Sequence, residues 1–568
     1  MYSSRMNALI VALANLVRFL RNAAARAMRR HPADFVVLPV SGSLPELEPS
    51  RRGLLRRRLD PRPTGPSLEG IRTRLDRILA DGRPAGVVLR VENLDVGWAS
   101  LEELRAEISR FRGSGKKVVA YFVDPDTRAY YLAAAADEVY ATPLSTLHVV
   151  GLRARVNFLK DSLDRVGLKA EVIAVSPYKS AGDSLARSDF SREAREQTGR
   201  LLDRRFDALL DAISAGRGVT PERAHSLVDG APYLAVDAQK EGLIDGALYE
   251  DELPGRLGGD GSPARLAEWG AAKRALRLPY RKRTRRVVAL VGVEGTIVRG
   301  RSRRLPIPLP LLGGVQAGSE SVVAALRVAE KNRRVGAILM HVESPGGDAL
   351  ASDLIWREVE RIRRKKPLVV LMGNVAASGG YYVSAPASRV VARANTVTGS
   401  IGVVLTRPVA AGLFEKLEVN PATVQRGARA NLLDPRHKPS PDELAVLTGQ
   451  LNGIYGEFKD RVARGRGIPP EDVEPLAGGR VWTGTEALEK GLVDELGGFR
   501  DALEAAKNLA GIQGNPPDLL VKITAPGGAR PTPGEPVREA VDAARAALAD
   551  LKAARVWALS PYDASDGW

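Results

Sequence analysis

The chain has 568 residues, of which 44% are hydrophobic, enough to bury more core than one conventional domain holds. It has no cysteine, which excludes disulfides and thiolate metal sites, and its five scattered histidines argue against a metal hydrolase. The formal net charge of +17 is typical of a solvated basic surface or of attraction to anionic lipid. The sequence has no nucleic-acid-binding motif that would favour nucleic acid as a partner.

The N-terminal head, residues 1–40, begins with an apolar stretch, Met6–Leu20, which arginines interrupt and follow. This stretch is shorter than the ~20 residues that cross a bilayer, and no signal-peptide cleavage pattern follows it directly. The pattern favours an amphipathic helix lying on a membrane surface, with a plain packed helix as the alternative.

Three segments of the chain recur about 250 residues further on, and a shared offset of this kind indicates a duplication. The matching pairs are 86–97 with 336–347, 130–143 with 381–394, and 240–246 with 490–496. We therefore expect a first repeat over 69–285 and a second over 286–515. A Pro-rich linker and a C-terminal helix are expected over 516–568.

Within each half, short runs rich in valine, isoleucine and leucine alternate with helical stretches. The predicted elements in chain order are strand Val87–Val91, helix Leu101–Arg112, strand Val287–Val293, helix Ser319–Asn332, strand Val335–Val342 and strand Pro367–Met372. Buried parallel strands joined by crossover helices have this pattern, so the predicted fold class is α/β.

The strand ending at Val342 runs into a glycine turn, Ser344–Gly347, ahead of another predicted helix. Glycine lets backbone N–H groups approach a ligand closely, so Gly346 or Gly347 can hold a carbonyl oxygen as it becomes an oxyanion. An ordinary glycine turn is the alternative interpretation.

Ser378 follows the strand Pro367–Met372 and is flanked by small residues at the expected start of a helix. A serine at such a corner is exposed to attack a carbonyl, and the N–H of Gly379 stands beside it as an oxyanion donor. The alternative is that Ser378 only caps the helix.

A comparison of the two halves of the sequence favours a catalytic role for Ser378 over a helix cap. Thr127 stands where the second half has Ser378, and Lys179 stands where it has Arg429. Arginine stays protonated near neutral pH, whereas a lysine becomes a base when burial lowers its pKa. The complementary pattern predicts a nucleophile, Ser378, and a base, Lys179, contributed by different halves. Drift that inactivated both halves is the alternative.

A Ser-His-Asp triad is the rival mechanism. His341 lies on the strand before the glycine turn and His437 lies in a Pro-rich loop, and neither belongs to a triad motif. With so few histidines in the chain, the Ser-Lys pair is the more economical hypothesis.

These motifs resemble those of the signal peptide peptidase A family, also called protease IV, in its long, duplicated form. The resemblance extends over roughly residues 69–509 and rests on four motifs: Tyr178–Ala181, Ser344–Gly347, Ala376–Tyr382 and Thr398–Val403.

The resemblance implies that Ser378 is the nucleophile, that Lys179 is the general base and that Ser400 orients the lysine. The oxyanion donors would be Gly379 and either Gly346 or Gly347. Asp348 stands where a small residue is common in the family, so the substrate preference is expected to differ.

The resemblance further implies two tandem repeats of the crotonase and Clp-protease fold, with parallel sheets and crossover helices. The expected activity is endopeptidase cleavage of hydrophobic peptides, such as cleaved signal peptides, without metal or cofactor. The chain would form a homo-oligomer, a tetramer in the family, associated with the bacterial inner membrane, and nucleic acid is not an expected partner.

Two other functional classes stay open. The first is an acyl-CoA enzyme of the crotonase type, which holds an oxyanion on glycine turns but needs no nucleophilic serine. The second is a non-catalytic, membrane-associated scaffold built from decayed repeats.

Overall fold

The computed structural model describes residues 2–27, 32–48, 66–259, 261–282, 284–309, 313–420, 422–514, 519–523 and 555–559. The C-terminal helix expected within 516–568 lies outside these residues. The described residues form two compact units. The first comprises the residues up to Arg153 together with Leu202–Thr284, and the second comprises Ala154–Leu201 together with the residues from Arg285 onwards.

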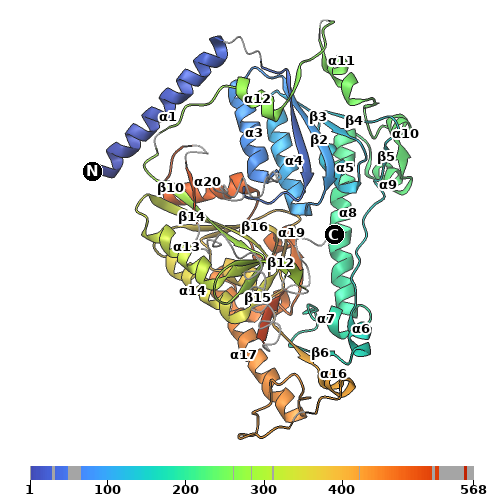
Figure 1. Cartoon of the computed structure of the whole chain (residues 1–568), viewed down its shortest axis with the longest axis vertical. Helices are drawn as coiled ribbons and strands as arrows, with labels where there is room; N and C mark the ends of the chain where they lie inside the picture. The colour runs from blue at the N-terminus through green and yellow to red at the C-terminus, as the bar shows by residue number, and fades with distance from the viewer. Residues whose placement is uncertain are drawn as a thin grey trace. The chain divides into compact units, whose positions relative to one another are not determined.

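The first unit begins with the helix α1 (Tyr2–Ala27; Figure 1). Polar side chains of α1 bond the backbone of a later segment of the same unit. The amide of Asn15 bonds the backbone of Arg281 at 3.0 and 2.7 Å, and the amide of Asn22 bonds Leu278 at 3.1 and 3.0 Å. Among the described residues, no helix is both long and apolar enough to cross a bilayer.

The first unit is built on a sheet in which all neighbouring strands are parallel. In spatial order its strands are β8 (Gly246–Ala247), β4 (Glu138–Ala141), β3 (Lys117–Phe122), β2 (Gly86–Leu94), β1 (Phe35–Gly42) and β9 (Leu266–Glu268). The sheet thus begins at Phe35, ahead of residue 69, where the first repeat was expected to start.

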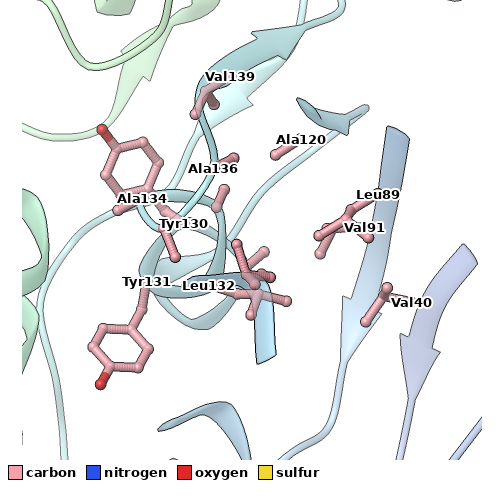
Figure 2. Packing of buried hydrophobic residues seen from close by; sticks show 14 of the residues in the cluster. Val40, Leu89, Val91, Ala120, Tyr130, Tyr131, Leu132, Ala134, Ala136 and Val139 are labelled. Carbon is pink, nitrogen blue, oxygen red and sulfur yellow. The ribbon is translucent and has the colours of Figure 1, made fainter. Parts of the chain in front are cut away.

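Helices cover this sheet and enclose the core of the first unit. They include α3 (Leu68–Asp81), α4 (Trp98–Gly113), α5 (Thr127–Ala133), α9 (Pro221–Asp229), α10 (Ala235–Lys240) and α12 (Trp269–Ala275). Figure 1 shows α3 and α4 side by side. Figure 2 shows Leu89 and Val91 of β2 turned toward Leu132 of α5, and all three side chains are buried in one apolar cluster.

The main sheet of the second unit is parallel except where β18 meets β20. Its strands are β20 (Val481–Thr483), β18 (Val397–Gly399), β16 (Leu368–Ala377), β14 (Val335–Ser344), β10 (Val287–Glu294) and β22 (Leu520–Lys522). In addition, β17 (Arg389–Ala392) pairs with β16, and β21 (Glu495–Leu496) pairs with β17. The order β22-β10-β14-β16-β17-β21 parallels β9-β1-β2-β3-β4-β8 of the first unit.

Helices also cover the sheet of the second unit, among them α13 (Ser319–Lys331), α14 (Ala349–Arg363), α15 (Gly379–Ser384), α17 (Pro441–Arg466), α19 (Gly484–Glu489) and α20 (Phe499–Ala510). Strands β14 and β16 are buried along almost their whole length, as a parallel sheet between helical layers requires. The predicted mixed α/β fold with parallel sheets is confirmed. Both strands run beyond their predicted ends, β14 to Ser344 and β16 to Ala377.

A second sheet of this unit joins segments that are distant in sequence. In spatial order it contains β12 (Arg303–Leu309), β13 (Gly313–Gly318), β11 (Thr296–Val298), β15 (Gly346–Asp348), β23 (Arg555–Leu559), β19 (Val404–Val409) and β6 (Lys169–Ala174). Strand β6 pairs antiparallel with β19, with Ala174 opposite Val404. This pairing brings part of the first half of the chain into the second unit.

Candidate active site

Ser378 forms the corner between strand β16 and helix α15. Its backbone has φ 53° and ψ −114°, a left-handed conformation that residues other than glycine rarely adopt. A hydrogen bond of 2.7 Å from its N–H to the carbonyl oxygen of Gly399 fixes the corner. Its side chain makes no capping bond to α15, so the hydroxyl is not used as a helix cap.

Lys179 reaches this hydroxyl from the loop after β6. The distance from Lys179 Nζ to Ser378 Oγ is 2.6 Å, and Nζ also bonds the carbonyl oxygen of Ser400 at 2.8 Å and its hydroxyl at 3.0 Å. Lys179 is 1% exposed, and Ser378 and Ser400 are fully buried. The structure thus brings together the three residues that the sequence singled out, within the second unit.

The amine of Lys179 is buried, and its hydrogen bonds join it to oxygens of Ser378 and Ser400. Burial lowers the pKa of Lys179 well below its ordinary value of 10.5. An uncharged amine has two N–H groups and one lone pair. It can donate to both Ser400 oxygens and accept the Ser378 proton, which is what a general base requires.

A glycine allows the lysine loop to pack closely. Gly479 has φ 79°, and a β-carbon added there would lie 2.5 Å from the backbone nitrogen of Lys179. Any other residue at this position would therefore push the lysine loop away. The loop itself is a tight turn, in which the N–H of Lys179 donates to the carbonyl of Ser176 at 3.2 Å.

A further layer of contacts holds Tyr178, the neighbour of the lysine. The guanidinium of Arg480 lies 3.7 Å from the centre of the Tyr178 ring. Gln197 donates to the Tyr178 carbonyl at 3.3 Å and accepts from the N–H of Val481 at 2.9 Å. Sequence reasoning missed these supports, although the paired glycines Gly478 and Gly479 beside them were a visible signal.

Ser400 follows β18 at a second strained corner. Its φ is 51°, and its N–H donates to the carbonyl of Arg480 at 2.6 Å. Hydrogen bonds therefore fix the backbone of Ser400 as well as that of Lys179. This arrangement lets both oxygens of Ser400 face Lys179.

The glycine turn lies against the start of α15. A β-carbon added at Gly379 would lie 3.0 Å from the nitrogen of Gly347 and 3.1 Å from the Cα of Gly346. The N–H of Gly346 donates to Ser344 Oγ at 3.2 Å. Gly379 and the two glycines of the turn therefore lie close together, as donors to one oxyanion must.

Asp348 has a structural role at the end of the glycine turn. It is fully buried, and its carboxylate accepts the N–H of Ala351 at 2.8 Å as the N-cap of α14. Arg299 pairs with the same carboxylate at 2.9 Å. These contacts fix the end of the glycine turn.

Glu343, which the sequence analysis did not single out, supports the end of β16. Its carboxylate accepts the N–H groups of Asn374 and Val375 at 2.8 and 3.0 Å and the Asn374 amide at 3.1 Å. The pairing of β14 with β16 shifts register at this point. Burial raises the pKa of Glu343 to about 7 in spite of these donors. Its place beside the glycine motif was the available signal.

The two histidines of the rival triad are engaged elsewhere. His437 Nε2 lies 2.8 Å from the carboxylate of Glu443 in the first turn of α17. His341 is buried on β14 and lies beside Gly373, where an added β-carbon would be 3.2 Å from its Nε2. The partner of the Ser378 hydroxyl in the structure is Lys179.

The counterparts of the two central residues do not form a second site of this kind. Thr127 begins α5, and its hydroxyl donates to the backbone carbonyls of His148 and Gly151, both at 3.2 Å. Arg429, the counterpart of Lys179, is exposed. The two halves therefore differ in structure at the positions where they differ in sequence.

Comparison with known proteins gives consistent matches. The sequence profile of peptidase family S49 matches this chain twice, at residues 110–257 and 360–513. Serine protease SPPA, chloroplastic, of Arabidopsis thaliana is 33% identical over 82% of this chain and 68% of its own length. Protease 4 of Haemophilus influenzae is 32% identical over 76% of this chain and 71% of its own length.

Among solved structures, a ClpP1 mutant from Listeria monocytogenes aligns with 38% of this chain and 94% of its own, at 16% identity. The TM-score of 0.25 is too low to carry an argument about the fold.

Proposed function

Because the chain belongs to peptidase family S49, we propose that it is a serine endopeptidase in which Ser378 is the nucleophile and Lys179 is the general base. The family resemblance predicted from the motifs is confirmed by the two profile matches. The observation that carries the proposal is the 2.6 Å contact between Ser378 Oγ and Lys179 Nζ in a buried setting, where the hydroxyl can donate to the uncharged amine.

In the proposed reaction, uncharged Lys179 takes the proton of Ser378 as its oxygen attacks a peptide carbonyl. The N–H groups of Gly379 and of either Gly346 or Gly347 hold the oxyanion, and Ser400 keeps the amine aimed at the nucleophile. The protonated lysine then gives its proton to the leaving amine, and water hydrolyses the acyl-enzyme. A positioned base of this kind contributes about 10²–10⁴-fold to the rate.

The proposed substrates are extended hydrophobic peptides, such as cleaved signal peptides at a membrane. Helix α1 supports a membrane surface as partner, since Leu9, Leu13, Leu16 and Leu20 form one exposed apolar stripe. The stripe lies on the side of α1 opposite Asn15, Asn22 and the other polar contacts that hold the helix. A homo-oligomer, expected as a tetramer, stays a prediction.

We also propose that the chain consists of two tandem repeats with a crotonase and Clp-protease-like fold. The shared strand order of the two parallel sheets and the twofold profile match support this proposal. The proposed repeats have different tasks, with the second keeping the nucleophile corner and the first supplying the lysine.

Fluorophosphonate labelling with mass-spectrometric mapping tests the assignment. We expect label on Ser378 in the wild type, no label in Ser378→Ala, and at least a 100-fold slower reaction in Lys179→Ala, from the loss of a base. Ser384→Ala is the matched control, because this buried serine of α15 bonds only the backbone of its own helix, at 2.7 Å from Gly380 O.

The same experiment separates the alternatives. Turnover of acyl-CoA by a folded enzyme that takes no label would favour a crotonase-type activity. A folded protein that neither labels nor turns over peptide esters or acyl-CoA would favour the scaffold. Full activity in either Ser378→Ala or Lys179→Ala would defeat the proposed dyad.

A further inference from the structure

The first unit has a basic pocket where side chains of α1, α3 and α12 come together. The pocket has a volume of about 380 Å³, within the range of small-ligand sites. Four cationic side chains line it: Arg21 of α1, Arg77 of α3, and Lys273 and Arg274 of α12. Among the described residues, no carboxylate lines this pocket. Its lining therefore favours an anionic ligand.

Two of the four cations are held together by shared acceptors. The guanidinium groups of Arg21 and Arg77 both donate to the carbonyl oxygens of Lys273 and Leu276 at the end of α12. Each guanidinium lies 3.3 Å from the oxygen of Leu276. The two carbonyls fix the positions of the arginines, but they carry no net charge that would neutralise them.

Arg77 shows the cost of this crowding. Burial first, and then the neighbouring charge of Arg21, lower the pKa of Arg77 to about 10. Asp81 opposes this shift, but its carboxylate accepts from the Arg83 side chain at 2.5 and 2.8 Å and from the N–H of Arg277 at 2.5 Å. A bound anion would offset the remaining repulsion between the two guanidinium groups.

Phosphate is the anionic group that this lining fits best. A guanidinium presents paired donors that match two oxygens of a phosphate, and an ammonium adds a compact charge. Lys273 and Arg274 are exposed, and among the described residues neither forms an ion pair. Four cations around one site can serve more oxygens than a carboxylate offers, so they favour phosphate.

The place of the pocket on α1 indicates where the phosphate comes from. Ala24 and Ala25 also line the pocket, and Ala24 lies about one helical turn beyond Leu20, the last residue of the exposed apolar stripe. A helix that lies on a membrane with this stripe in the bilayer brings its flanks to the depth of the lipid headgroups. The pocket would then face the lipid phosphates.

We propose that the pocket formed by α1, α3 and α12 is a phosphate-binding site that takes the headgroup phosphate of an anionic lipid. Arg21 and Arg77 form its fixed, half-buried part, and Lys273 and Arg274 form its exposed rim. A lipid bound there fixes the orientation of α1 on the membrane surface. This binding function is separate from the proposed dyad and does not depend on it.

Vesicle binding by the full-length chain tests the site. The variant Lys273→Gln/Arg274→Gln removes the two exposed cations of the rim. Lys240→Gln/Arg256→Gln is the matched control, because it removes two exposed cations elsewhere on the first unit and changes the net charge equally. With phosphatidylcholine vesicles containing about 20% phosphatidylglycerol, we expect Kd to rise at least about tenfold in the rim variant and less than about threefold in the control.

Calorimetric titration with inorganic phosphate distinguishes a lipid from a soluble ligand. If phosphate binds the wild type and not the rim variant, while both proteins bind vesicles equally well, the ligand is a soluble phosphate and the lipid assignment is wrong. If the rim variant and the control lose vesicle binding to the same extent, only the net charge acts and the proposed site is overturned. Both measurements need no catalysis, so they are independent of the peptidase assignment.

Discussion

Replacing Lys179 with methionine should change the pH dependence of stability as well as abolish activity. Burial lowers the pKa of Lys179 well below 10.5, so the amine is uncharged in the folded protein over a range in which the unfolded chain carries its proton. Unfolding then takes up a proton. The lysine's contribution to stability is fully present above pH 10.5 and is lost as the pH falls toward the folded-state pKa.

The size of the effect follows from this linkage. Between the folded and unfolded pKa values, each pH unit changes the free energy of unfolding of the wild type by about 1.4 kcal/mol. Methionine has a similar length and no proton to bind, so its variant lacks this slope. With an unfolding entropy of about 2.1 cal/mol/K per residue, the difference corresponds to about 2 °C in Tm per pH unit for a unit as large as the second one. Methionine also leaves the Ser400 carbonyl without its Lys179 partner, at a cost that does not vary with pH.

Calorimetric melting from pH 7 to 10 measures this difference between the two proteins. The variant Lys331→Met is the control, since Lys331 is an exposed lysine in the last turn of α13. Glu343 contributes a slope of the opposite sign, because its raised pKa removes stability as the pH rises through about 7. That slope is common to all three proteins and cancels. Parallel Tm curves for wild type and Lys179→Met would refute a buried, uncharged lysine.

Two further predictions concern the orientation of the base and the membrane. Ser400→Ala removes one of three hydrogen bonds of Lys179, worth about 1 kcal/mol, so kcat/KM should fall about 5–10-fold, against at least 100-fold for Lys179→Met. Equal losses in steady-state assays would contradict this ranking. The double variant Leu13→Glu/Leu16→Glu should reduce the fraction of protein that floats with phosphatidylglycerol vesicles more than tenfold. The double variant with methionine at both positions should float like the wild type. Equal flotation of the two double variants would exclude α1 as the membrane contact.

Much of the fold was predictable because local hydrophobic patterns in the sequence indicate its strands and helices. The apolar runs that became β14 and β16 are buried on both faces, and this burial makes their sequences continuously hydrophobic. The matching segments allowed each half of the sequence to be compared with the other. This comparison led to the hypothesis that Ser378 is a nucleophile and Lys179 a base. Their 2.6 Å contact agrees with that hypothesis.

What the sequence did not reveal depends on pairing between distant segments. Strand β6 pairs with β19 across more than two hundred residues, and β23 pairs with both β15 and β19 from near the end of the chain. Periodicity reports which face of a strand is buried, not which strand lies beside it. The ion pair of Asp348 could not be predicted for a related reason, since its partner Arg299 is distant in sequence.

The placement of β6 explains how both halves of the chain can contribute to the one proposed active site. The lysine loop is tied to the second unit by the β6–β19 ladder, by the close approach at Gly479 and by Gln197. These contacts all lie within the unit that contains Ser378. The geometry of the proposed dyad therefore depends on the packing of one compact unit and not on how the two units are arranged. With the lysine held in this way, the proposed dyad needs no nucleophile in the first half, where the Thr127 hydroxyl bonds backbone carbonyls.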